Sequence, residues 1–295
     1  MTTASLRSAI EKKRFVTAPG VHDMIAAKLA DLVGFDFVYA SGFWQVASAY
    51  GLPDVGIATY TEMLARISLL AKNSKAAIIA DADTGYGGLL NVHHTVQGYE
   101  AAGVRGIQIE DQTFPKKCGH TPNVRVVPCD EMVEKIQVAC AARTDPAETL
   151  IIARTDAIQT EGLSKAIGRA QAYADAGADI LFVEALESEE DMRTACSEIA
   201  KPMLANMADG GRTPILPAAQ LEEIGFSAAI FPAMVALAAS AAMKQALTTL
   251  KSTGTSQSDS LELLDFNEFQ QFIGFPDVWA LEEKWAAVHG EPSDG

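Results

Sequence analysis

Short runs rich in β-branched and aromatic residues alternate along the chain with longer segments whose apolar residues recur every three or four positions. The short runs are typical of buried strands, and the longer pattern is typical of amphipathic helices. Eight strands are predicted, at 14–20, 35–41, 76–83, 105–111, 150–157, 179–185, 202–207 and 228–232. The helices predicted between them include 61–72, 92–103, 130–142 and 163–177.

Glycines stand between several predicted helices and the strands that follow, at Gly34, Gly103, Gly177 and Gly225. Glycine is favoured there because it readily adopts the left-handed backbone that ends a helix. Strands that alternate with helices favour parallel pairing through right-handed crossovers. About eight such units predict an α/β fold of the TIM (β/α)8 barrel type. An open, doubly wound parallel sheet is the alternative, since one miscounted unit would change the architecture.

The barrel is predicted to span residues 1–250, followed by a polar linker at 251–260. The linker is rich in serine and threonine, a composition typical of flexible connections. The extension at 261–295 carries Phe, Trp and Leu at near-helical spacing over 266–288. An apolar helix must bury its face, so we expect this extension to pack on its own barrel or on a partner subunit.

Composition excludes several classes of partner. The chain is 48% hydrophobic and 21% charged, with a formal net charge of -15. Such an acidic surface repels nucleic acid and anionic lipid, so we expect neither as a main partner. An anionic substrate would have to meet a locally cationic or metal-bearing pocket. The four cysteines form no CxxC pair, and no secretory signal is apparent, which together predict a cytoplasmic location.

Polar residues gather where the predicted strands end. In a TIM barrel this end of the strands is the active-site face. Each residue alone has a structural explanation, but nearly every strand contributes one, which favours a shared site. The residues are Tyr39, Ser41, Asp81, Asp83, Glu110, Asp111, Arg154, Asp156, Glu184 and Asn206.

Asp81 and Asp83 are two positions apart on one predicted strand, so their carboxylates point to the same side. A divalent cation would relieve their repulsion, and oxygen ligands favour Mg²⁺ or Mn²⁺ over Zn²⁺. Glu110 on the next strand could complete the set through a water molecule. A helix-capping or salt-bridged aspartate pair is the alternative interpretation.

Cys118 lies between Lys117 and His120 in the segment FPKKCGH, just beyond a predicted strand. Neighbouring cations lower the pKa of a thiol and favour the thiolate, so a reactive cysteine is predicted. It could serve as a nucleophile or as a general acid or base. The alternative is an unreactive cysteine in a surface loop.

Taken together, five segments resemble one family. They are YASGF at 39–43, GLPDVGIAT at 51–59, DADTGYGG at 81–88, IEDQ at 109–112 and KKCGH at 116–120. The chain is similar, over almost its whole length, to the isocitrate lyase/phosphoenolpyruvate mutase superfamily. It resembles the short lyase branch, with its 2-methylisocitrate lyases, 2,3-dimethylmalate lyases and oxaloacetate hydrolases. Mutases and phosphonopyruvate hydrolases lack the KCGH motif.

This resemblance implies roles for the matching residues. Asp83 would bind Mg²⁺ directly, while Asp81 and Glu110 would hold it mainly through water. Cys118 would protonate an enediolate that Lys117, His120 and Arg154 stabilise, and Glu184 would line the pocket beside them. The residues expected to bind the substrate are Tyr39, Ser41, Gly42, Phe43, Asp54, Gly119 and Asn206.

The resemblance also implies an assembly and a reaction. The eighth helix would be exchanged between two subunits, and the dimers would pair into a tetramer. The reaction would be Mg²⁺-dependent cleavage of a carbon–carbon bond in a substituted malate or 2-methylisocitrate-type acid, giving pyruvate and a carboxylate. An oxaloacetate hydrolase or decarboxylase is the alternative within the superfamily, and a catalytically idle barrel used for binding is the alternative outside it.

Three residues depart from the pattern expected of this branch. Met234 stands at the end of the eighth strand, where a serine or threonine would offer a hydroxyl to the substrate. Methionine has no such donor, which disfavours the hydrolase. Trp44 is larger than the residue expected there, and Arg212 is a candidate for binding a distal carboxylate.

Overall fold

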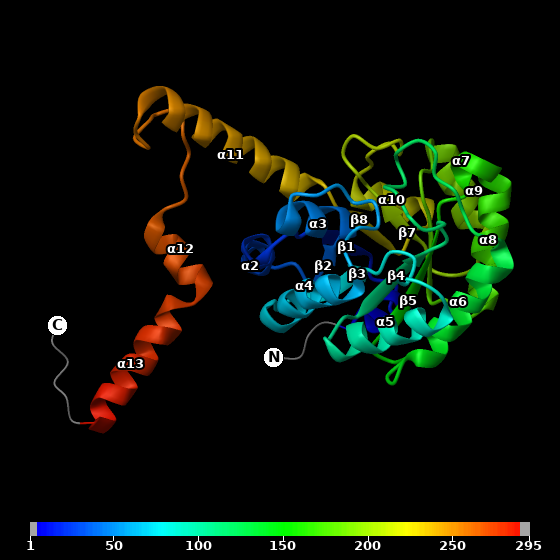
Figure 1. Cartoon of the computed structure of the whole chain (residues 1–295), viewed down its shortest axis with the longest axis horizontal. Helices are drawn as coiled ribbons and strands as arrows, with labels where there is room; N and C mark the ends of the chain where they lie inside the picture. Colours follow the sequence, from blue (N-terminus) through cyan, green and yellow to red (C-terminus); the bar gives the residue numbers. More distant parts are fainter. Residues whose placement is uncertain (1–4, 290–295) are drawn as a thin grey trace. The chain divides into compact units, whose positions relative to one another are not determined.

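Eight parallel strands form a closed barrel in the computed structural model, which describes residues 5–289. The strands are β1 (Val16–Pro19), β2 (Phe37–Ala40), β3 (Ala77–Asp81), β4 (Gly106–Glu110), β5 (Leu150–Thr155), β6 (Ile180–Val183), β7 (Leu204–Asn206) and β8 (Ala228–Phe231). Ladders run through β2–β6 and through β1, β8 and β7. Parallel bridges from Gly20 to Tyr39 and from Leu181 to Met203 join these two sheets into a ring. The TIM-barrel prediction is therefore confirmed over the open sheet (Figure 1).

Neighbouring residues on each strand face opposite sides of the barrel wall. On β2, Phe37 and Tyr39 belong to the cluster inside the barrel, whereas Val38 and Ala40 belong to the cluster beneath the helices. This period of two is the geometry of a pleated strand. Both clusters are apolar, which explains why the strands appear in the sequence as continuous hydrophobic runs. Leu6 is fully buried in the inner cluster, so the chain before β1 also contributes to the barrel core.

Helices surround the strands, as Figure 1 shows. They are α1 (Leu6–Glu11), α2 (Met24–Val33), α3 (Gly42–Tyr50), α4 (Tyr60–Asn73), α5 (Leu89–Ala101), α6 (Cys129–Ala142), α7 (Ile158–Glu161), α8 (Leu163–Asp175), α9 (Glu189–Glu198) and α10 (Ala218–Ile224). The four glycines predicted to end helices all have positive φ. At the start of α4, Thr59 and Glu62 form a reciprocal capping box, which satisfies backbone donors that the helix itself leaves free.

The chain divides into two compact units, residues 1–237 and 238–295. Helix α11 (Met234–Thr253) begins in the first unit and extends three residues into the predicted linker. The second unit also holds α12 (Phe266–Ile273), which Asp265 caps through the N–H groups of Asn267 and Glu268, and α13 (Phe275–His289). Residues 290–295 of the predicted extension lie outside the described residues. Among the helices of residues 5–289, none is long and apolar enough to cross a membrane.

Candidate active site

A cavity of about 330 Å³ opens where the strands end. Thirteen of the residues predicted for the site line it: Tyr39, Ser41, Phe43, Asp54, Asp81, Glu110, Lys117, Cys118, Gly119, His120, Arg154, Glu184 and Asn206. Four others do not line it. Gly42 and Asp83 contact Asp81, Asp156 contacts Arg154, and Asp111 contacts Asp156. Residues that are far apart in the sequence therefore meet at one place, as expected for the active-site face of a barrel.

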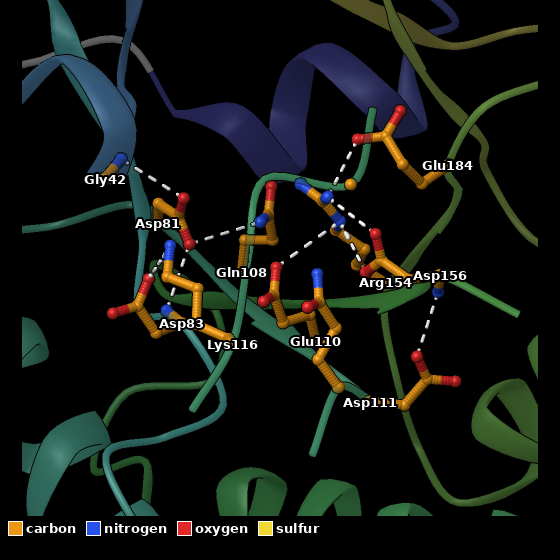
Figure 2. A network of polar contacts seen from close by, with 12 residues as sticks. Gly42, Asp81, Asp83, Gln108, Glu110, Asp111, Lys116, Arg154, Asp156 and Glu184 are labelled. Carbon is orange, nitrogen blue, oxygen red and sulfur yellow. Dashed lines mark hydrogen bonds and ion pairs between the residues drawn. The ribbon is translucent and has the colours of Figure 1, made fainter. Parts of the chain in front are cut away.

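The carboxylate of Asp81 is held by three donors at the end of β3 (Figure 2). The backbone N–H of Gly42 donates to Oδ2 at 3.1 Å, and the backbone N–H of Asp83 donates to Oδ1 at 3.0 Å. Gln108 Nε2 lies 3.3 Å from Oδ1, and its Oε1 accepts a hydrogen bond from Tyr39 at 2.8 Å. Gln108 was not among the residues predicted for the site, because it lies within a strand whose sequence is typical of a buried core.

A buried lysine lies among the carboxylates next to Asp81. Lys116 is 3% exposed, and its Nζ lies 2.7 Å from Asp83 Oδ1, an ion pair without hydrogen-bond geometry. The same ammonium group donates a hydrogen bond to Asp54. Asp83 is thus in a salt bridge, as the alternative interpretation of the aspartate pair supposed, and a cation already sits among these acids. Asp83 has a positive φ of 48°, an uncommon conformation for a side-chain-bearing residue.

Burial makes these carboxylates hard to ionise together. Desolvation raises the pKa of Asp83 to about 7 despite the nearby Lys116. It also raises the pKa of Glu110 well above its usual value, although Arg154 opposes the shift. Crowded acids of this kind release protons more readily when further positive charge arrives.

The donor atoms in this acidic cluster, Asp81, Asp83 and Glu110, fit a hard divalent cation. Buried Oε1 of Glu110 has no hydrogen-bond partner, and Oδ1 of Asp83 has none beyond its ion pair with Lys116. Buried polar atoms rarely lack a partner, and a bound ion can satisfy those that do. All the candidate ligands are oxygens, which suits Mg²⁺ or Mn²⁺. Within residues 5–289, no group of three or more His, Cys, Asp or Glu side chains is already arranged around one point, so a bound ion would require small shifts of these side chains.

Arg154, at the end of β5, is held by acids from three directions. Its Nε and Nη2 donate to the two carboxylate oxygens of Asp156 at 2.9 and 2.8 Å. Nη2 also lies 3.0 Å from Glu184 Oε2, and Nε lies 3.5 Å from Glu110. A bidentate pair fixes the plane of the guanidinium group. Asp156, which the sequence placed at the strand end without a role, is therefore what orients Arg154.

The loop at 116–120 is closed against the rest of the site. The side chain of Gln112 bonds both backbone groups of Lys117, with each contact at 2.9 Å. Gln159 donates to the carbonyl oxygen of Gly119. A Cβ on Gly119 would lie 2.4 Å from Arg154 Nη2, so only glycine allows the loop to approach so closely. Gln112 belongs to the IEDQ segment, but its role in holding the loop depends on a contact that the sequence does not show.

His120 is oriented by contacts with both of its ring nitrogens. Nδ1 accepts a hydrogen bond from the backbone N–H of Arg212 at 3.2 Å. Nε2 lies 3.3 Å from Glu184 Oε1 and 3.4 Å from Asn206 Nδ2. Because Nδ1 accepts, the proton of the neutral ring belongs on Nε2, where it can be donated to Glu184.

Cys118 lines the cavity, but its thiol is not the reactive thiolate that the sequence predicted. Burial raises the pKa of the Cys118 thiol, which outweighs the lowering by the backbone N–H of His120 and by Arg154. Lys116, the other lysine of the KKCGH segment, is paired with Asp54 and Asp83. The prediction of a lowered pKa is therefore wrong, because burial shifts the pKa in the direction that favours the protonated thiol.

The three residues that depart from the expected pattern lie in different places. Trp44 lines the cavity and makes an edge-to-face contact with Phe43, with ring centroids 4.9 Å apart. The guanidinium of Arg212 lies 3.2 Å from Glu187, and Arg212 is not a lining residue. Met234 is 51% exposed and does not line the cavity either. The residues that β8 and its end present there are Ile230, Pro232 and Ala233.

A family model described as phosphoenolpyruvate phosphomutase matches residues 6–251. The chain belongs to the phosphoenolpyruvate mutase/isocitrate lyase superfamily. The chain is 43% identical to the 2,3-dimethylmalate lyase of Eubacterium barkeri, and the aligned region covers 97% of this chain and 98% of that protein. The 2-methylisocitrate lyase of Aeropyrum pernix is 40% identical, covering 92% and 87%. The prediction of a carbon–carbon lyase is confirmed at the level of enzyme class.

The fold of this chain is also similar to solved structures of the superfamily. A crystal structure of 2,3-dimethylmalate lyase superimposes with a TM-score of 0.90 at 36% identity, covering 99% of both chains. Oxaloacetate acetylhydrolase in complex with 3,3-difluorooxalacetate also gives a TM-score of 0.90, at 31% identity, covering 99% and 98%. Phosphonopyruvate hydrolase in complex with oxalate and Mg²⁺ gives 0.85 at 28% identity, covering 95% and 97%.

Proposed function

We propose that the protein is a Mg²⁺-dependent lyase that cleaves a carbon–carbon bond in a 2-hydroxy acid with two or three carboxylates. The products would be pyruvate, or another 2-keto acid, and a shorter carboxylate. The observation that carries this proposal is the meeting of two features in one cavity. One is an acidic cluster that includes the unpartnered Oε1 of Glu110, and the other is the thiol of Cys118, whose pKa burial raises.

Asp83 would hold the metal directly, and Asp81 and Glu110 would hold it mainly through water molecules. When bound, Mg²⁺ supplies a Lewis acid that lowers the pKa of a neighbouring hydroxyl group. Mn²⁺ has similar ligand preferences and should substitute for it. One solved relative, phosphonopyruvate hydrolase, is in complex with oxalate and Mg²⁺, which supports this assignment by similarity.

Residues at the start of α3 would bind the substrate. Ser41 precedes the helix, and its hydroxyl makes no capping bond, so it remains free to donate to a carboxylate. The backbone N–H groups of the first turn, at Gly42 and Phe43, add the favourable field of a helix N-terminus. Arg154, already oriented by Asp156, would hold the oxygen that becomes the keto group. Tyr39, Asp54, Gly119 and Asn206 would complete the wall around the substrate.

The substrate hydroxyl would lose its proton to solvent, the keto C=O bond would form from the resulting alkoxide, and the C–C bond would break with its electron pair going to the departing carboxylate fragment as an enediolate. Lys117 and His120 line the same cavity and would stabilise this negative charge. Cys118 would then transfer its thiol proton to the carbon that lost its bond, leaving a thiolate that regains a proton from water. A raised pKa suits this role, because a general acid must be protonated before it acts.

Hydrolysis of oxaloacetate is the second candidate function, and the structural similarity to oxaloacetate acetylhydrolase supports it. Hydrolysis would be helped by a hydroxyl group that binds the hydrated keto carbon. At the end of β8 the cavity wall is made by Pro232 and Ala233, neither of which has a side-chain donor. The lyase is therefore favoured over the hydrolase.

A pyruvate-release assay tests the proposal directly. The panel is malate, citramalate, 2,3-dimethylmalate, isocitrate and 2-methylisocitrate, with oxaloacetate as the comparison substrate and Mg²⁺ in excess. We expect pyruvate from at least one 2-hydroxy acid and little turnover of oxaloacetate. Rapid release of oxalate and acetate from oxaloacetate, without pyruvate from any hydroxy acid, would establish the hydrolase instead.

We also propose that the protein is a cytoplasmic homo-oligomer, as the sequence predicts. The apolar residues of α12 and α13 would pack on a partner subunit, with the eighth helix of the barrel exchanged in a dimer and dimers paired into a tetramer. A cytoplasmic enzyme acting on a small carboxylic acid, with no nucleic-acid or membrane partner, is consistent with the acidic chain.

A further inference from the structure

The charges around the cavity show how many substrate carboxylates it can neutralise, on the assumption that the proposed lyase function holds. Five acids line it: Asp54, Asp81, Glu110, Glu184 and Asp209. The permanently charged cations on its wall are Lys116, Lys117 and Arg154. Acids therefore outnumber the permanently charged cations on the wall, and each substrate carboxylate needs a cation that is not already committed.

Two of those three cations are already committed to protein carboxylates. Lys116 is paired with Asp54 and Asp83, and Arg154 is paired with Asp156 and Glu184. Lys117 makes no ion pair with any acid in residues 5–289. One carboxylate would be held beside the metal and α3, and a second could pair with Lys117. A third carboxylate would find no further permanently charged cation, and both ring nitrogens of His120, the other basic residue of the wall, are already engaged by Arg212 and Glu184.

Arg212, the residue that the sequence offered for a distal carboxylate, does not change this count. Its guanidinium group is paired with Glu187, and its side chain is not part of the cavity wall. Only its backbone N–H reaches the site, where it is used by His120. Asp209, three residues before Arg212, does line the cavity, and this acid would repel a carboxylate.

Apolar side chains occupy another part of the wall. Trp44 and Phe43 from α3 line the cavity together with Ile230, Pro232 and Ala233 from the end of β8. None of these side chains offers an ionic partner, and a carboxylate against them would lose its hydration without compensation. Alkyl groups, by contrast, gain free energy when they are buried against such a surface.

We infer that the substrate is a 2-hydroxy dicarboxylate carrying small alkyl groups, an alkylated malate, and that 2-methylisocitrate-type tricarboxylates are poor substrates. Trp44 is a specificity-determining residue, because its ring contributes to the apolar surface that receives the alkyl group. Asp209 acts in the opposite direction by disfavouring a further negative charge.

Steady-state kinetics test the substrate class. The wild-type enzyme with Mg²⁺ should show a kcat/KM for 2,3-dimethylmalate at least tenfold above that for 2-methylisocitrate. It should also prefer 2,3-dimethylmalate to unsubstituted malate by about tenfold or more, since each methylene in an apolar pocket is worth roughly 10–200-fold. A kcat/KM for the tricarboxylate equal to or above that for the dicarboxylate would overturn the inference.

Variants test the residues. Trp44→Ala should reduce the preference for 2,3-dimethylmalate over malate several-fold, whereas Leu90→Ala, an exposed apolar change outside the cavity, should leave it unchanged. Asp209→Asn should raise the relative turnover of 2-methylisocitrate by removing a repulsive charge. If Trp44→Ala and Leu90→Ala behave alike while both remain folded by circular dichroism, Trp44 does not set specificity.

Binding of unreactive acids separates this inference from the proposed function. Calorimetry with Mg²⁺ present should give a Kd for 2,3-dimethylsuccinate at least tenfold below that for tricarballylate. Such a result without any pyruvate release would support the dicarboxylate cavity and refute the lyase. Tighter binding of tricarballylate would refute the dicarboxylate cavity, whether or not pyruvate is released.

Discussion

Asp111 accepts a hydrogen bond from the backbone N–H of Asp156, with an oxygen-to-nitrogen distance of 2.9 Å, and so supports the residue that orients Arg154. The other oxygen of Asp111 accepts from Thr155 at 2.7 Å and from Tyr173 at 2.8 Å. Asp111 is 1% exposed and does not line the cavity. It follows Glu110 directly in the sequence, yet Glu110 lines the cavity whereas Asp111 supports Asp156 from behind the cavity wall.

Replacement of Asp111 by asparagine should therefore weaken catalysis from outside the cavity. The side-chain N–H₂ group of asparagine would face hydrogen-bond donors that now donate to the carboxylate. This should destabilise the fold by about 1–3 kcal/mol. A shift of Asp156 would misalign Arg154, so we expect kcat/KM to fall about 10–100-fold. Tyr173→Phe, which removes one of the bonds to the same carboxylate, should have a smaller effect. Wild-type kcat/KM in a folded Asp111→Asn enzyme would contradict this role.

Removal of metal should abolish activity, because the acidic cluster needs a cation to complete it. Activity should disappear in excess chelator and return with Mg²⁺ or Mn²⁺, and Asp83→Ala should lose more activity than Asp81→Ala. As a readout independent of turnover, saturating Mg²⁺ should raise Tm, since about 100 Kd of ligand stabilises by about 2.7 kcal/mol. Full activity in chelator would exclude the metal.

Cys118→Ser should fail in the chemical step, because a serine hydroxyl is a far weaker acid than a thiol. The loss should appear in kcat and be about 10²–10⁴-fold, with Mg²⁺ and product binding retained. Cys129→Ser, at a cysteine outside the cavity, is the matched control. In D₂O the non-pyruvate product should carry one deuterium at the carbon that lost its bond. Near-normal turnover by Cys118→Ser would identify another group as the acid.

The pH dependence should follow the raised pKa of Cys118. A general acid acts only while protonated, so activity that depends on Cys118 should be lost as pH rises through that raised pKa. The alkaline limb should therefore lie above the ordinary thiol value of about 8.5. Alkylation of Cys118 by iodoacetamide, followed by mass spectrometry, should be slow at neutral pH and accelerate over the same alkaline range. Fast alkylation at pH 7 would indicate a thiolate instead.

Truncation after Thr253 tests the predicted assembly. Residues 254–289 include α12 and α13, whose Phe266 and Trp285 are 71% and 58% exposed. If these helices pack on a partner subunit, the truncated chain should shift towards monomer or aggregate in light scattering. An unchanged oligomeric mass would argue against the exchange of helices between subunits.

Local patterns in the sequence determined the barrel and most of the residues at its mouth. Each strand is a short, buried run bounded by polar residues and turns, and parallel βα units have few ways to close. Once the strands are placed, their polar ends must meet, which is why Asp81, Glu110 and Arg154 could be assigned to one site. The short KKCGH segment likewise stood out as a run of reactive residue types.

Only the tertiary structure decided how those residues pair. Lys116 and Lys117 are adjacent in the sequence, but the first is buried between Asp54 and Asp83 and the second lines the cavity without an acidic partner among residues 5–289. The pKa of Cys118 follows from burial, which depends on the packing of distant segments rather than on its neighbours. Whether Arg212 reaches the cavity depends likewise on Glu187, 25 residues earlier. Hydrophobic periodicity specifies local elements, whereas desolvation and ion pairing depend on distances that exist only after the chain has folded.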